Sequence, residues 1–379
     1  MLDYETLKFI WWVLIGALLL GFAIMDGHDM GVGTLLPFAG KNDVERRIMI
    51  NTVGPHWDGN QVWFITAGGA IFAAWPLVYA TAFSGFYWAM LAVLWALFFR
   101  PVGFDYRSKI ENPAWRNTWD WGLFVGGAVP PLIFGVAFGN LLQGVPFHFD
   151  DNLRSFYTGS FWELLNPFAL LTGVVSTAMI TFHGANYLMI RTEGDVFRRV
   201  RTASLIFGAL TLATFALAGV WLAAGMKGFV ITSTIDHNAL PNPLDKTVAL
   251  ETGAWLKNYS LYPATMLVPA AAFAGGLLAL LAAWLKKPLL AFVGSSVCML
   301  GIIGTAGVSL FPFVMPSSSD PRSSLTVWDS VSSQMTLGLM LVATIIFLPL
   351  IIIYTSWAYK KMSGKVTEAF IHANDKSAY

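Results

Sequence analysis

Nine long apolar segments limit the possible folds of this chain more than any other feature of the sequence. A helix needs about 20 apolar residues to cross a bilayer, and lipid leaves the backbone no partner outside its own helix. The sequence therefore predicts an all-α polytopic membrane protein with nine transmembrane helices. The segments are Phe9–Leu36, Gln61–Ala80, Phe83–Phe99, Trp119–Leu141, Leu164–Ile190, Thr202–Gly225, Tyr262–Leu285, Leu289–Phe311 and Met335–Tyr359.

Composition agrees with this prediction. Of the 379 residues, 56% are hydrophobic and 12% are charged, whereas soluble domains carry about 25% charged residues. A net charge of +1 gives no reason to expect nucleic acid as a partner. The single cysteine, Cys298, excludes a disulfide or a cysteine-based metal site within one chain. No soluble domain fits between the segments, so we expect one transmembrane domain over residues 1–379, with the first apolar run kept as a helix.

The second and third segments form the least regular pair. Pro76 interrupts the second segment, and Phe83–Phe99 is short for a span. The sequence leaves two arrangements open, a tight transmembrane hairpin and a kinked pair.

Basic residues predict the orientation of the chain. Cytoplasmic loops of membrane proteins carry an excess of Lys and Arg. With the N-terminus outside the cell, only six of the 23 basic residues fall in outside segments. We therefore expect a periplasmic N-terminus and a cytoplasmic C-terminus. The six are Lys8, Arg154, Lys227, Lys246, Lys257 and Arg322.

Asp26, His28 and Asp29 lie at the end of the first apolar segment. A charge inside a membrane helix costs about 3 kcal/mol and is kept mainly where it handles ions or protons. Asp26 and Asp29 share one helix face, where neighbouring carboxylates favour proton binding. Solvation beyond the lipid is the alternative. The glycines at 27, 31 and 33 favour a protein-facing site, since small residues let helices pack closely.

Asp58 and His56 precede the second segment. Asp58 with Gln61 has the spacing of a helix N-cap and its capping-box partner. Trp-Asp recurs at Trp119-Asp120 and Trp328-Asp329, which favours capping as the role of all three acids. A proton-handling role for Asp58 is compatible with capping. His56 is either a polar interfacial residue or part of a relay.

Two further residues have an ordinary and a sharper interpretation. His183 is the one histidine deep within a predicted helix, where packing and hydrogen bonding are the default and haem or metal ligation is the alternative. Arg100 ends the third segment, where it either reaches toward the interface or pairs with the acidic cluster. No phosphate-binding or hydrolase motif stands in a suitable setting.

Six motifs spread along nearly the whole chain resemble subunit II of cytochrome bd-type ubiquinol oxidases. The resemblance is to an enterobacterial chain, more to the bd-II type of isoenzyme than to the main one. Where the family usually has Phe, this chain has His28, which adds a titratable group. The motifs are Asp26–Gly31, Trp57–Trp63, Phe72–Pro76, Arg100–Arg107, Gly139–Phe147 and Phe311–Ser318.

The resemblance implies two four-helix bundles plus one peripheral helix in the bacterial inner membrane. It implies a haem-bearing subunit I that carries haems b558, b595 and d and oxidises quinol, and a small single-helix subunit as a further partner. Subunit II would ligate no haem and no metal, and it would carry no catalytic residue. The enzyme would reduce O2 to water and generate proton motive force without pumping.

The resemblance also implies roles for individual residues. Asp58 matches a position on a cytoplasmic proton path toward haem d, with Asp26, Asp29 and His28 as auxiliary sites. Trp63 matches the neighbourhood of an oxygen entry route. A structural ubiquinone, ubiquinone-8 in such bacteria, would lie among the helices, and its expected contacts are His56, Trp57 and Asn60.

Two hypotheses follow from the sequence. The first is the non-haem subunit of a quinol:O2 oxidoreductase that contributes to proton delivery. The second is an ion-coupled secondary transporter or channel that uses the Asp26/Asp29 pair as ion ligands.

Overall fold

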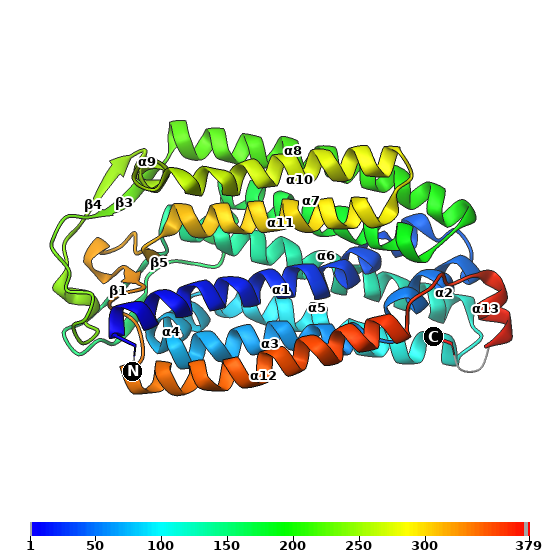
Figure 1. Ribbon diagram of the computed structural model, residues 1–379, viewed down its shortest axis with the longest axis horizontal. Coiled ribbons are helices and arrows are strands. Elements are labelled where there is room, and N and C mark those ends of the chain that lie inside the picture. The colour runs from blue at the N-terminus through cyan, green and yellow to red at the C-terminus, as the bar shows by residue number, and fades with distance from the viewer. Residues whose placement is uncertain (1, 375–377) are drawn as a thin grey trace.

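The computed structural model describes residues 2–374 and 378–379, and it forms an elongated bundle of long helices (Figure 1). Within these residues, eight helices are long and apolar enough to cross a membrane, and the bent pair α3–α4 makes a ninth candidate. The predicted all-α polytopic fold is confirmed. The helices are α1 (Tyr4–Ala39), α3 (Trp57–Ala74), α4 (Pro76–Gly85), α5 (Tyr87–Tyr106), α6 (Pro113–Gln143), α7 (Pro167–Arg191), α8 (Gly194–Gly225), α10 (Leu267–Trp284), α11 (Pro288–Leu310) and α12 (Gln334–Lys361).

The kink lies within the second segment, at Pro76, and the third segment is a separate candidate span. α3 ends at Ala74 and α4 begins at Pro76, and the two helix axes are bent by 119°. Proline has no N–H for the preceding turn, so a new helix starts there instead of continuing the old one. α5 then follows as a helix of 20 residues, longer than the apolar run predicted for it.

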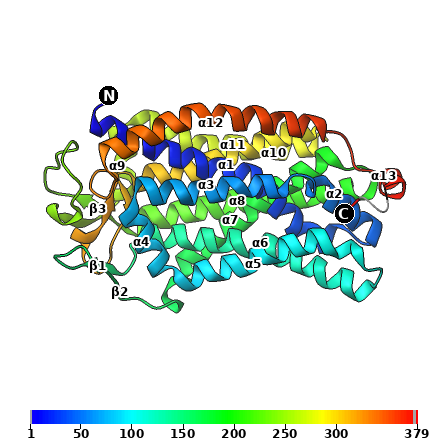
Figure 2. The same cartoon turned by 90° about the horizontal axis from the view of Figure 1, so that it is seen from below.

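The long helices form two groups and one outlying helix. α1, α3, α5 and α6 pack together, and α7, α8, α10 and α11 form the second group. α1 also packs against α7, which joins the two groups. α12 lies at the edge of the molecule against α1 and α3 (Figures 1 and 2). This arrangement agrees with two four-helix bundles plus a peripheral helix.

Close approach of helix backbones holds α1 at the centre. A Cβ atom placed on Gly31 would lie 2.3 Å from the carbonyl oxygen of Ile180 in α7. One placed on Gly127 in α6 would lie 2.4 Å from the carbonyl oxygen of Met30. No side chain fits at these distances, so glycine is required where α1 crosses both neighbours. The close packing predicted from the glycines of α1 is confirmed.

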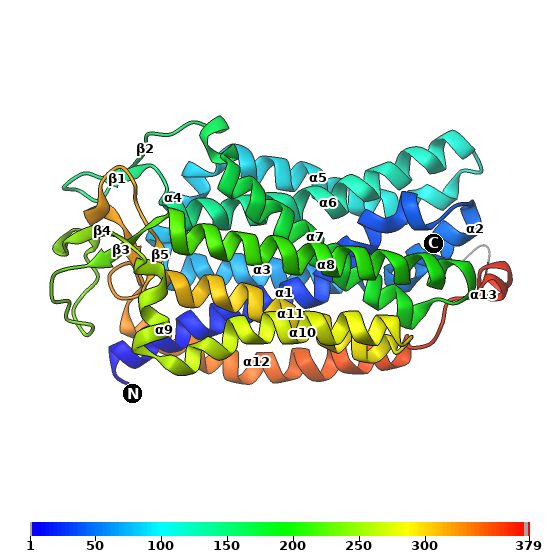
Figure 3. The same ribbon diagram turned by 90° about the horizontal axis from the view of Figure 1, so that it is seen from above.

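The polar ends of the bundle carry the shorter elements (Figure 3). The end that holds the N-terminus has three two-stranded antiparallel sheets, and the opposite end has α2 and α13. The chain termini lie at opposite ends, as an odd number of crossings requires. These elements are α2 (Asp43–Val53), α9 (Lys257–Leu261), α13 (Glu368–Ala373), β1 (Phe147–Phe149), β2 (Ser155–Tyr157), β3 (Lys227–Ile231), β4 (Val248–Thr252), β5 (Phe313–Met315) and β6 (Leu325–Thr326).

The capping role predicted for the Trp-Asp pairs is wrong. Asp58 lies inside the first turn of α3, whose N-cap is His56. Asp120 lies within α6, because Asn112 caps that helix and Pro113 starts it about two turns earlier. Asp329 lies in a loop, where it accepts a hydrogen bond from the Thr326 N–H and pairs with Lys246 at 2.8 Å.

Candidate functional site

The acidic cluster of α1 is buried within the bundle. Asp26 is 0% exposed, His28 is 1% exposed and Asp29 is 2% exposed. The alternative in which these groups are solvated beyond the lipid is therefore wrong. The glycine contacts with α6 and α7 explain the burial, because they bring neighbouring backbones over this face of α1.

Asp26 forms an ion pair with Arg100 of α5. Two guanidinium nitrogens donate to the two carboxylate oxygens, with 2.9 Å from Nη1 to Oδ2. Both side chains are buried, so each charge depends on the other for compensation. The predicted pairing of Arg100 with the acidic cluster is confirmed. Because Arg100 compensates the charge of Asp26 only, the two acids of α1 have different electrostatic environments.

Asp29 points toward the start of α3 and not toward Arg100. The Asn60 side-chain amide donates to Asp29 Oδ2 at 2.7 Å. His28 Nε2 lies 3.2 Å from Asp29 Oδ1, and His56 Nδ1 lies 3.7 Å from the same oxygen. Two histidines, one carboxylate and one amide thus meet at the contact between α1 and α3.

Two tyrosines from distant parts of the chain complete this cluster. The Tyr187 hydroxyl of α7 lies 3.0 Å from His56 Nε2 and donates to the Thr52 carbonyl at 3.1 Å. The Tyr359 hydroxyl of α12 donates to Asn60 Oδ1 at 2.9 Å. The sequence analysis missed both tyrosines. A tyrosine near the end of an otherwise apolar helix was the only available signal.

Asp58 does not join the buried cluster. It is exposed on α3, one residue after the buried Trp57. The indole of Trp57 stacks on Phe104, with ring centroids 5.1 Å apart, and lies 5.5 Å from the Arg100 guanidinium carbon. At this height of the bundle, Asp58 therefore faces outward, whereas Trp57 and Arg100 face inward.

Trp63 lies further along α3 and is half-buried. A Cβ atom on Gly21 of α1 would be 2.6 Å from the Trp63 ring, so the indole lies directly on the α1 backbone. This position puts an aromatic surface between the two helices at mid-bundle.

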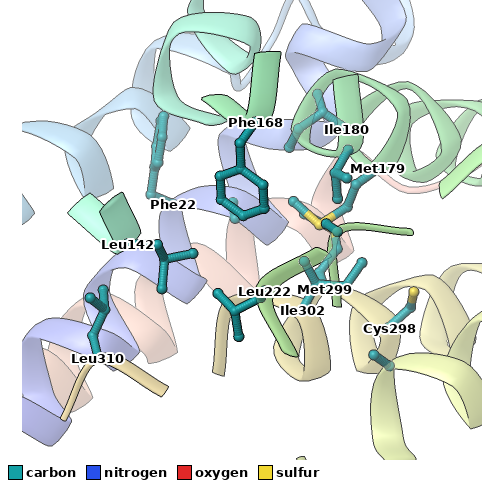
Figure 4. Packing of buried hydrophobic residues seen from close by; sticks show 14 of the residues in the cluster. Phe22, Leu142, Phe168, Met179, Ile180, Leu222, Cys298, Met299, Ile302 and Leu310 are labelled. Atoms are coloured by element: carbon teal, nitrogen blue, oxygen red, sulfur yellow. The ribbon is translucent and has the colours of Figure 1, made fainter. Parts of the chain in front are cut away.

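A separate apolar cavity of about 280 Å³ lies between α1, α6, α7, α8 and α11 and is partly open to the surface. Figure 4 shows part of its wall, where Phe22, Phe168 and Leu222 approach one another from three helices. Its few polar groups include the hydroxyls of Thr172 and Ser176. His56, Trp57 and Asn60 are not among the residues that line it.

His183 has a structural environment. Its Nδ1 lies 2.8 Å from the Ser295 hydroxyl, and its Nε2 lies 3.1 Å from the Ile24 carbonyl. Both ring nitrogens are thus engaged within the protein, which leaves neither for an iron atom. Packing and hydrogen bonding, the default predicted for this residue, describe its surroundings.

A family model described as Cytochrome bd terminal oxidase subunit II matches residues 7–362. The chain belongs to this family. This subunit II is 57% identical over 379 residues to the Cytochrome bd-I ubiquinol oxidase subunit 2 of Escherichia coli, with complete coverage of both chains. It is also 57% identical, again over both full lengths, to the Probable cytochrome oxidase subunit 2 of Haemophilus influenzae.

A more distant relative and a solved structure agree. The Cytochrome bd ubiquinol oxidase subunit 2 of Bacillus subtilis is 32% identical over 367 residues, which cover 96% of this chain and 97% of that one. The bd oxidase structure from Geobacillus thermodenitrificans matches 93% of this subunit II and 97% of its own chain, with a TM-score of 0.68. At 14% identity that structural match supports the fold alone.

Family membership establishes the membrane location of the chain and the enzyme complex to which it belongs. The chain is a multi-pass protein of the bacterial inner membrane and part of a terminal oxidase, an enzyme complex that contains haem. Its partner is subunit I of that complex. In the His28–His56 cluster, the His28 ring lies against the Tyr187 ring, with centroids 4.1 Å apart and the planes tilted by 35°.

Proposed function

We propose that this chain is the non-haem subunit of a ubiquinol oxidase of the cytochrome bd type. It supports the haem-bearing subunit and supplies a cytoplasmic entrance for protons that are consumed when O2 is reduced. Two of its relatives carry the name ubiquinol oxidase, which supports quinol as the electron donor. Net charge separation comes from taking protons inside and releasing quinol protons outside.

The charge distribution supports the orientation that this proposal needs. A periplasmic N-terminus puts the Asp58 end of α3 at the cytoplasmic side, near α2. Seventeen of the 23 basic residues then lie on the cytoplasmic side, as the distribution of Lys and Arg in inner-membrane proteins favours.

Exposure of Asp58 is the observation that carries the proton proposal. A carboxylate at the first turn of a helix, open on the outside of this chain, can take up a proton and present it to a neighbouring subunit. Arg100 holds a positive charge on the inner side of the same helix contact, which disfavours proton transfer between Asp58 and the interior at that level. We infer that subunit I packs over Asp58.

Asp58→Asn tests this role in the purified complex. We expect O2 uptake with a soluble ubiquinol to fall by about 10²-fold, the lower end of the range for a positioned proton-transfer group. The reduced-haem spectrum should stay normal, because Asn keeps the size of the side chain. The control is Asp195→Asn, which changes an exposed carboxylate at the start of α8. Wild-type turnover by a spectrally intact Asp58→Asn complex would exclude the role.

We also propose that the apolar cavity holds a structural ubiquinone. Its wall of aromatic and aliphatic side chains suits an isoprenoid molecule, and the hydroxyls of Thr172 and Ser176 suit a quinone head group. His56, Trp57 and Asn60 do not line this cavity, and their predicted contacts with ubiquinone stay a separate prediction.

Filling the cavity tests the ubiquinone proposal. Gly219 lies at the exposed edge of the cavity, where a Cβ atom meets nothing within 4 Å and a large side chain would obstruct the entrance. Gly219→Phe should therefore reduce the quinone extracted from the purified complex by about one equivalent per complex. Gly68→Phe is the control, because Gly68 also has open space at its Cβ but does not line the cavity. Equal quinone content in both variants would contradict the proposal.

The other assignments stay predictions. These are oxygen entry near Trp63, auxiliary proton roles for Asp26, Asp29 and His28, the three named haems in subunit I, the small single-helix subunit and the bd-II type. The transporter hypothesis has lost its main support, since Arg100 occupies the Asp26 carboxylate that it needs as an ion ligand.

A further inference from the structure

Three potential metal ligands converge at the contact of α1 and α3. They are His28 Nε2, His56 Nδ1 and Asp29 Oδ1, and these atoms all lie within 4.8 Å of one another. All three residues are buried. Two imidazoles and one carboxylate are a donor set that suits first-row transition metals and zinc.

Hydrogen bonding on the far side of each ring points the lone pairs inward. His28 Nδ1 lies 3.0 Å from the Ile24 carbonyl, and a carbonyl only accepts, so this nitrogen carries the ring proton. His56 Nε2 lies 3.1 Å from the Thr52 carbonyl and carries its proton for the same reason. His28 Nε2 and His56 Nδ1 are therefore acceptors in the neutral rings. A backbone carbonyl behind each ring is the support that metal-ligating histidines normally have.

Asp29 contributes an independent observation. Its Oδ1 is fully buried and has no hydrogen-bond partner among the described residues, while Oδ2 accepts from Asn60. An unpartnered carboxylate oxygen that faces two imidazole lone pairs is unfavourable unless a positive charge lies between them. Asn60 Nδ2 lies 3.1 Å from His56 Nδ1, and the Tyr359 hydroxyl lies 3.3 Å from His56 Nδ1 and 3.4 Å from His28 Nε2, so these two groups compete with an ion for the imidazole lone pairs.

We propose that His28, Asp29 and His56 bind one divalent transition-metal ion, with zinc as the representative species. Tetrahedral zinc with bonds of about 2.0–2.1 Å needs ligand atoms about 3.3 Å apart. The two separations from Asp29 Oδ1, 3.2 and 3.7 Å, are close to that value. The Tyr359 hydroxyl lies 3.4 Å from His28 Nε2 and 3.3 Å from His56 Nδ1, so it or a water molecule would be the fourth ligand.

The surrounding charge agrees with a dication. Asp26 is neutralised by Arg100, so Asp29 is the one carboxylate of the cluster left to offset the charge of the ion. Magnesium and calcium are poor candidates, because both prefer shells made of oxygen alone. This inference is independent of the proton role proposed for Asp58, which is not among the ligands, but it uses His28 and Asp29, for which an auxiliary proton role is predicted.

Metal content of the purified oxidase tests the site. The complex is treated with a chelator, reloaded with zinc chloride and freed of excess metal by gel filtration. Zinc is then measured against haem iron by mass spectrometry. We expect the wild type to retain one zinc per complex more than His28→Phe or Asp29→Asn. His28→Phe keeps an aromatic ring against Tyr187, and Asp29→Asn keeps the size of the side chain.

A matched control and a second readout make the outcome decisive. His148→Phe alters a histidine on β1 at the other end of the molecule and should keep the wild-type zinc content. X-ray absorption of the zinc-loaded wild type should show two imidazoles in the first shell, and this measurement needs no variant to fold. Equal zinc content in wild type and both ligand variants, or a first shell without two imidazoles, would overturn the proposal.

Discussion

The buried Arg100–Asp26 pair offers the most direct test of how this bundle tolerates charge. Side-chain exposure is 2% for Arg100 and 0% for Asp26. Removing one partner of a buried pair leaves an uncompensated charge and typically costs about 3–5 kcal/mol. A cost of 3 kcal/mol corresponds to a change of roughly 150-fold in an equilibrium or rate constant. We therefore expect Asp26→Asn and Arg100→Gln each to destabilise the complex severely.

The assay is the half-life of haem absorbance in the purified complex at one elevated temperature. Large membrane complexes unfold irreversibly, so a rate is the appropriate measure of their stability. Asp26→Asn should shorten the half-life by about 10-fold to 150-fold. The 150-fold decrease is expected if the ion pair is already broken in the transition state for unfolding. The half-life of the double variant Asp26→Asn/Arg100→Gln should fall by less than the product of the two single-variant factors, because the double variant buries no unpaired charge.

A matched exposed pair serves as the control. Arg198 and Asp195 are also joined at 2.7 Å, but their side chains are 75% and 61% exposed. Exposed pairs contribute about 0–1 kcal/mol, so Arg198→Gln should change the half-life by about fivefold at most. A half-life of Asp26→Asn equal to that of Arg198→Gln would contradict a compensating role for the buried pair. So would a double variant whose half-life falls by the product of the two single-variant factors.

Two further substitutions test packing and charge elsewhere in the bundle. Gly31→Leu should prevent stable assembly, because its side chain would collide with the α7 backbone. Assembly is measured as the haem-containing complex recovered from membranes. The control is Gly338→Leu, which should assemble normally because its Cβ meets nothing within 4 Å. Asp120→Asn should lower thermal stability by about 3 kcal/mol or more, since it removes the carboxylate that pairs with buried Arg107 at 2.5 Å, and an unchanged half-life would contradict this.

Much of the fold could be predicted because the bilayer imposes its own dimensions on the sequence. The nine apolar segments correspond to α1, the pair α3–α4, α5–α8 and α10–α12, with ends that differ by up to eight residues. Pro76 was a sufficient signal for the break between α3 and α4. α2 was missed, because its sequence has no long apolar run and its burial depends on packing against α1 and α13.

The site was only partly predictable, because its members come from segments far apart in the chain. Asp26, His28 and Asp29 drew attention because a charge in an apolar run is costly. Tyr187 and Tyr359 gave no such signal, and they reach the cluster only because α7 and α12 pack against α1. Asp58 was misassigned as a cap, since the Asp-x-x-Gln pattern does not reveal that α3 already starts at Trp57.

The two acids of α1 show why spacing alone could not assign their chemistry. Three residues of separation put Asp26 and Asp29 on one helix face, and that spacing suggested a shared ion or proton. The structure instead gives them different partners. Asp26 pairs with Arg100, whereas Asp29 accepts a hydrogen bond from the Asn60 amide and faces the rings of His28 and His56. The first acid is already compensated by a fixed cation. The second has a free oxygen that faces two imidazole lone pairs, so the uncompensated charge of this cluster rests on Asp29 alone. Any cation that enters this part of the bundle is therefore expected at Asp29, and substitutions at Asp26 should change stability without changing metal content.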